Sequence, residues 1–114
     1  MIERLDTKGL FLTYHYDSFN IELDRPLAEQ LDELDEDIIQ LEVDNTYIIN
    51  LGYYPSHTIE GEFQVKIMKQ FDWKQAIWTK TSKTPHGLLA ILQEAVNEVK
   101  KLTVPDEDKT VKSN

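Results

Sequence analysis

Apolar residues change their spacing along the chain, and each change predicts a different kind of element. In residues 24–38 they recur at steps of three and four, which is the period of an amphipathic helix. From Ile39 the period becomes two, which predicts a half-buried strand ending at a tight turn in residues 44–45. Residues 62–71 carry the clearest alternation and predict another strand.

Four further stretches complete the pattern. Residues 46–51 are rich in β-forming residues and predict a strand that returns from the tight turn. Residues 75–81 predict one more strand, and residues 85–102 predict a second helix with an apolar stripe at helical spacing. Residues 9–24 read as a β-hairpin that turns at Asp17 and Ser18. Strict alternation in its first strand would place Leu10, Leu12, Tyr14 and Tyr16 on one face.

The elements follow the order ββ-α-ββ-ββ-α and predict an α+β domain. Short connections favour a mostly antiparallel sheet of about six strands, with two helices packed on one face. The 114 residues suffice for a single domain, which we place at residues 1–102, and residues 103–114 predict a mobile tail. We expect one core that contains Leu31, Ile49, Val65, Ile67, Leu92 and Val96.

The charge of the chain is concentrated in one block. The formal net charge is −9, yet residues 17–44 hold eleven acids and one base, while the other residues hold ten acids and eleven bases. An acidic block repels nucleic acid and anionic membranes and attracts cationic partners, so we expect neither a nucleic acid nor a membrane partner. The alternative is a solvated face that aids solubility.

Composition also bears on the compartment. The chain has no cysteine, which excludes disulfides and thiolate metal sites and suits a reducing cytosol. We see neither a signal-peptide pattern nor an apolar stretch near the roughly 18 residues that a membrane span needs. The expected location is therefore cytoplasmic.

Candidate catalytic and metal-binding residues are scattered. His15, His57 and His86 show no zinc-ligand spacing, and the acids of residues 32–37 lack the glycine and alternate ligands of a calcium loop. There is no G-x-S-x-G motif, and a carboxylate pair at Glu60 and Glu62 is better explained as a solvated loop edge. We therefore expect no cofactor, no metal and no enzymatic activity, with dispersed-carboxylate catalysis as the weakest hypothesis.

Three stretches carry a resemblance to a known group of proteins. These are D-R-P-L-A-E-Q-L-D-E-L-D-E-D-I-I-Q-L-E at residues 24–42, N-L-G-Y-Y-P at residues 50–55 and G-E-F-Q-V-K-I at residues 61–67. With its small size, acidity and lack of cysteine, the chain resembles bacterial immunity proteins, the cognate inhibitors of contact-dependent and other polymorphic toxins. The resemblance implies a cytosolic protein that binds and blocks one toxin domain, and many such toxins are basic nucleases.

Two binding functions follow from these observations. The first is a toxin-immunity protein whose acids occupy a basic groove of the toxin, with aromatic anchors beside them. The alternative is a small acidic structural or regulatory subunit of another complex that uses the same face. The predicted partner-binding residues are Asp32, Glu33, Asp35 and Glu36, with Tyr54 and Trp73 as aromatic contacts. Oligomeric state is not predicted.

Overall fold

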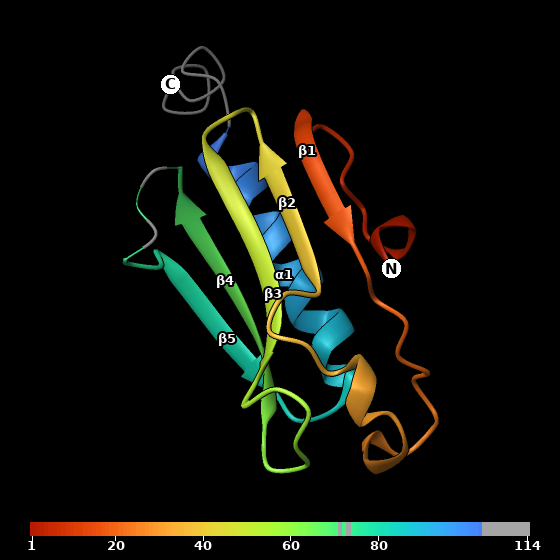
Figure 1. Ribbon diagram of the computed structural model, residues 1–114. Helices are drawn as coiled ribbons and strands as arrows, with labels where there is room; N and C mark the ends of the chain where they lie inside the picture. The colour runs from red at the N-terminus through yellow and green to blue at the C-terminus, as the bar shows by residue number, and fades with distance from the viewer. Residues whose placement is uncertain (71, 73, 104–114) are drawn as a thin grey trace, which may run out of the picture.

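Five antiparallel strands form one sheet in which each strand pairs with the next along the chain (Figure 1). The computed structural model describes residues 1–70, 72 and 74–103. The strands are β1 (Leu12–Asp17), β2 (Ile39–Val43), β3 (Tyr47–Tyr54), β4 (Glu62–Lys69) and β5 (Trp78–Ser82), and the α-helix is α1 (Pro85–Leu102). The α+β class and the antiparallel sheet are confirmed, but within the described residues there are five strands and one α-helix, not about six and two.

Helix α1 has the predicted bounds, and its local chemistry explains its start. The Thr84 hydroxyl caps the helix by accepting a hydrogen bond from the Gly87 amide at 3.0 Å, and Pro85 occupies the first turn. The apolar face includes Leu88, Leu92 and Val96, which are fully buried. Figure 1 shows α1 packed along one face of the sheet, so the other face has no helix of the described residues across it.

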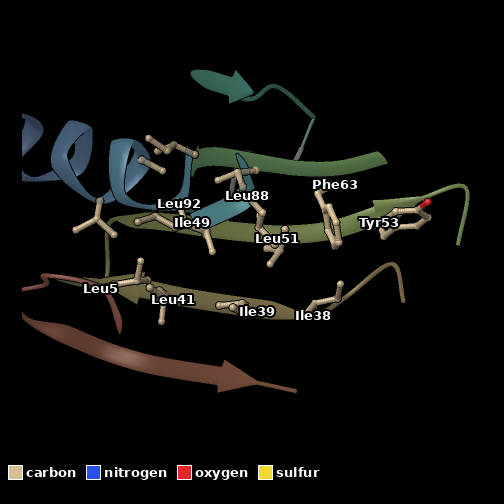
Figure 2. Close-up of a cluster of buried hydrophobic side chains, with 14 of the residues drawn as sticks. Leu5, Ile38, Ile39, Leu41, Ile49, Leu51, Tyr53, Phe63, Leu88 and Leu92 are labelled. Carbon is tan, nitrogen blue, oxygen red and sulfur yellow. The ribbon is translucent and has the colours of Figure 1, made fainter. Parts of the chain in front are cut away.

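The hydrophobic core fills the layer between α1 and the sheet. Alternate side chains of β2, β3 and β4 point into it, as Figure 2 shows for Ile39, Leu41, Ile49 and Leu51. The predicted core residues Ile49, Val65, Ile67, Leu92 and Val96 are all 0% exposed. Leu31 is the exception, because it is only partly buried at the edge of the cluster.

The predicted first helix is wrong. Residues 25–38 form two short 3-10 helices, η2 (Leu27–Glu29) and η3 (Leu31–Glu33), followed by an irregular link into β2. Gln30 interrupts them with φ −131°, and its side chain bonds the preceding backbone. Three acids at residues 35–37 would also crowd the negative end of an α-helix, which is unfavourable. Local hydrogen bonds therefore decide the conformation of this segment, although its apolar periodicity favours an α-helix.

The second strand of the predicted hairpin is also wrong. Residues 18–24 lie outside the sheet, because side chains satisfy their backbone. The Asp17 carboxylate accepts a hydrogen bond from the Phe19 amide at 3.0 Å, which turns the chain. Gln30 then bonds both the amide and the carbonyl of Glu22, at 2.7 and 3.0 Å. The backbone amides and carbonyls that a neighbouring strand would have bonded are therefore already occupied.

A β-bulge in β1 corrects the predicted strand face. Leu12 pairs with Val43 and Tyr14 pairs with Glu42, so one extra residue lies in β1 between the two pairs. Thr13 stabilises this irregularity, since its hydroxyl donates to the Glu42 carbonyl and accepts from the Asn45 amide. Leu12 consequently faces the core, whereas the tyrosines that follow turn to the opposite face.

Two predicted strands differ in extent. The last strand covers Trp78–Ser82, not residues 75–81, and β3 covers Tyr47–Tyr54, not residues 46–51. The predicted tail, residues 103–114, lies outside the described residues except for Thr103. The tight turn at Asp44 and Asn45 is present, with φ values of 54° and 51° that these two residue types tolerate.

Candidate protein-binding surface

Two of the predicted acids, Asp32 and Glu33, line an open hollow beside η2 and η3. Figure 1 shows these two short helices at the end of the sheet where α1 begins. The hollow has a volume of about 400 Å³, and its charged lining residues are Glu22, Arg25, Glu29, Asp32 and Glu33. Arg25 is the single base among the described lining residues. Its guanidinium lies 3.3 Å from the Glu22 carboxylate and 3.4 Å from that of Glu29, so it is already neutralised. The hollow therefore presents net negative charge.

Gln30 holds the hollow in shape. Its side chain is one of the few buried polar groups, at 5% exposure, and every hydrogen-bonding group of it is used. The oxygen accepts from the Glu22 amide, and the nitrogen donates to the carbonyls of Glu22 and Arg25. A buried amide that is fully bonded fixes the surrounding backbone, so the acids of the hollow project from a defined scaffold.

Asp35 and Glu36 lie in the link between η3 and β2, which is bonded by the end of β3 and by the loop after it. The Asp35 carboxylate is 2.6 Å from His57 Nε2, and the Asp35 carbonyl accepts from the Tyr53 amide at 2.8 Å. The His57 amide donates to the Leu34 carbonyl, also at 2.8 Å. Both side chains of the Asp35–His57 pair are about half exposed. Asp35 is therefore partly committed to holding the loop, while the Glu36 side chain is exposed.

Tyr54 belongs to the same junction. Its hydroxyl donates to the Glu36 carbonyl at 3.0 Å, and its ring lies against Gly52. A Cβ at Gly52 would collide with both the Glu36 carbonyl oxygen and the Tyr54 ring, so only glycine fits. Burial, then the charges of Asp37 and Glu36, raise the pKa of the Tyr54 phenol. The phenol therefore stays protonated and keeps its donor role at neutral pH.

The structure assembles the predicted residues into two adjoining groups. Asp35, Glu36 and Tyr54 are in contact at the junction, and Asp32 and Glu33 line the neighbouring hollow. Trp73 lies outside the described residues. Sequence reasoning missed the contribution of Gln30 and treated His57 as isolated, although His57 contacts Asp35. Asp35 and His57 are 22 positions apart in the chain, so no local pattern signals that contact.

The chemistry available at this surface is electrostatic and hydrogen-bonding. Within the described ranges, no group of three or more histidine, aspartate or glutamate side chains is arranged to hold a metal ion. Glu60 is exposed in the loop and Glu62 is half-buried at the start of β4. The expectations of no cofactor and no catalysis remain predictions, and elemental analysis of the purified protein tests the first.

Comparisons with known proteins give no relative. No family model, no curated protein and no solved structure matches the chain. No helix in the part of the chain that the structure describes is long and apolar enough to cross a membrane.

Proposed function

We propose that the chain is an immunity-type binding protein that occludes a cationic toxin domain, such as a basic nuclease. The observation that carries the proposal is the acidic hollow, where four carboxylates surround one base that is already paired with two of them. The resemblance of residues 24–42, 50–55 and 61–67 to immunity proteins supports the toxin as partner.

The proposed mechanism is steric and electrostatic. The acids attract a basic groove over a distance and accelerate encounter, as charge-complementary interfaces do. Asp32 and Glu33 then pair with cations of the toxin's groove. The bound chain thereby keeps the toxin's own substrate out of that groove. Because Gln30 and the Tyr54 junction fix the backbone beforehand, little ordering is left for the moment of binding.

The first test is co-purification with the product of the adjacent gene, followed by association kinetics with that product. Asp32→Lys combined with Glu33→Lys should slow association by roughly one order of magnitude or more and flatten its salt dependence. Glu94→Lys combined with Glu98→Lys changes the net charge equally on α1, away from the hollow, and should slow association far less.

Two outcomes contradict the proposal. If both double variants slow association equally, the effect comes from net charge and not from the hollow. If the adjacent product does not bind the wild-type chain, a toxin partner encoded there is excluded. Binding to a partner without toxin activity would instead favour the structural or regulatory subunit.

A further inference from the structure

The face of the sheet opposite α1 carries exposed tyrosines among polar side chains. Paired residues of neighbouring strands share a face, so the register groups the side chains there into rows. One row contains Tyr14, Glu42, Ile48 and Met68, and the next contains Tyr16, Gln40, Asn50 and Lys66. We call this surface the open face. Ile48, Met68 and Asn50 are buried in its middle, so its accessible part combines exposed tyrosines with the polar side chains around them.

The β-bulge at Thr13 gives the open face its aromatic edge. Without the extra residue, Tyr14 and Tyr16 would share the face of Leu12 and point toward the α1 side. With it, both tyrosines lie on the open face, and they are 48% and 45% exposed. Two large side chains that could have joined the core are therefore directed into solvent, in a position where bulges often aim functional side chains.

The charges of the open face favour a cationic occupant. Glu42 lies beside Tyr14, and Glu62 lies beside Tyr54 at the far end of β3. Lys66 is the single base that the described pairing assigns to this face. Its ammonium lies 5.8 Å from the centre of the Tyr54 ring. Lys66 thus already lies against Tyr54 in the geometry of a cation–π contact. Glu62 pairs with the same tyrosine across the two strands.

We propose that the open face docks an arginine-rich surface of a protein partner. The guanidinium groups stack on Tyr14 and Tyr16, and the Glu42 carboxylate pairs with them. Arginine is favoured over lysine because its planar group stacks on rings and bonds carboxylates in two places. A second copy of the chain fits poorly, since it would bring the same acids to a protein of net charge −9. The proposal goes beyond the toxin hypothesis, because it assigns a different surface and does not require a toxin.

The test uses the full chain labelled with ¹⁵N and two peptides, nona-arginine and nona-lysine, titrated at physiological salt. Nona-arginine should bind more tightly, and amide shifts should centre on β1 and β2. Tyr14→Ala combined with Tyr16→Ala leaves the net charge unchanged and should weaken nona-arginine binding by roughly five- to thirtyfold. Ile59→Ala combined with Ile77→Ala removes two exposed side chains elsewhere and should not weaken it.

Further variants keep the test decisive. Tyr14→Phe combined with Tyr16→Phe retains the rings and should bind nearly as the wild type, even if the alanine variant fails to fold. Equal affinity for the two peptides, shifts centred on the hollow or unchanged binding by the alanine variant would each overturn the proposal. Concentration-dependent dimerisation through β1 without peptide would overturn it too, in favour of a second copy. The Asp32→Lys and Glu33→Lys variant should keep shifts on β1, which separates this surface from the toxin hypothesis.

Discussion

The sheet-and-helix body, residues 39–102, and the acidic segment, residues 18–38, differ in what holds them. In the body, alternating apolar side chains of three strands pack against α1, and many of them are completely buried. In the segment, side chains hold residues 19–30, chiefly Asp17 and Gln30, and backbone bonds tie residues 34–38 to β3 and the loop after it. Ile21, Leu34 and Ile38 anchor the segment to the core. The body is a cooperative hydrophobic layer, whereas the segment depends on individual hydrogen bonds and a few apolar anchors.

The difference matters for binding, because the surface charge is carried mainly by the less regular region. Backbone held by side chains can place acids at several angles, as the hollow requires, while a straight helix would arrange them in one stripe. The sheet-and-helix body beneath the acidic segment supplies the rigidity of the surface. The acidic segment can therefore change its surface at little cost to the core.

The largest expected effect is in the body. Leu92→Ala removes a fully buried side chain of α1 and should lower the free energy of unfolding by roughly 2–5 kcal/mol, through lost burial and a cavity. Leu31→Ala is the matched variant in the acidic segment and should cost less than about 2 kcal/mol, since Leu31 is only partly buried. Chemical denaturation measures both. Equal costs would mean that the two regions share one core to the same degree.

An intermediate effect is expected where a hydrogen-bonding side chain replaces regular structure. Gln30→Ala removes three part-buried hydrogen bonds, one to the amide of Glu22 and one to each carbonyl of Glu22 and Arg25, and should cost roughly 1–3 kcal/mol. Gln64→Ala is the control, because that residue is half-buried on β4, and should change stability by less than about 0.5 kcal/mol. NMR spectra should show shifts confined to residues 18–38. Shifts throughout β2–β4 would show that the segment is not a separate unit.

Prediction from the sequence succeeded in the sheet-and-helix body and failed in the acidic segment. Helix α1 was predicted with its exact bounds because its apolar stripe, the Thr84 cap and Pro85 agree with one another. Strands β2, β3 and β4 were predicted because alternation and burial coincide. The segment failed because the leucine spacing of residues 27–38 also fits apolar anchors on irregular backbone. The bulge at Thr13 likewise has no sequence signal, since one extra residue leaves the alternation looking intact.

The candidate surface was predicted by residue type but not by geometry. Composition placed the acids in one block, and the structure places Asp32 and Glu33 at the hollow. The contact between Asp35 and His57 depends on bringing together residues far apart in the chain. The fit of Tyr54 over Gly52 depends on a backbone contact with Glu36 that no local pattern encodes.

The smallest expected effect is a pH dependence at the start of the acidic segment. Burial works against the charge of the Asp17 carboxylate, but hydrogen bonds from the Ile2 and Phe19 amides and from the Met1 amine outweigh it and lower its pKa. A lowered pKa in the folded state means that the unfolded chain binds the extra proton. Asp17 therefore contributes stability that is present above its unfolded pKa, near 3.9. That contribution is lost as pH falls through the folded pKa.

The Met1 amine makes folding stability depend on pH in the opposite direction. Burial lowers its pKa, but bonds and charges from Glu3 and Asp17 together leave that pKa raised, so its stability contribution is present below about 8.0 and is lost as pH rises through the folded value. In a preparation that begins at Met1, wild type and Asp17→Asn should differ most between about pH 4 and 8 and converge as the pH falls. Above about pH 8 they should come only partly closer, because the Ile2 and Phe19 amides still bond the charged Asp17 carboxylate. Denaturation midpoints across pH 2–10 measure the difference, which should be smaller than that of Gln30→Ala. A difference that does not change with pH would mean that Asp17 acts through shape alone, and that the turn at Phe19 needs no charge.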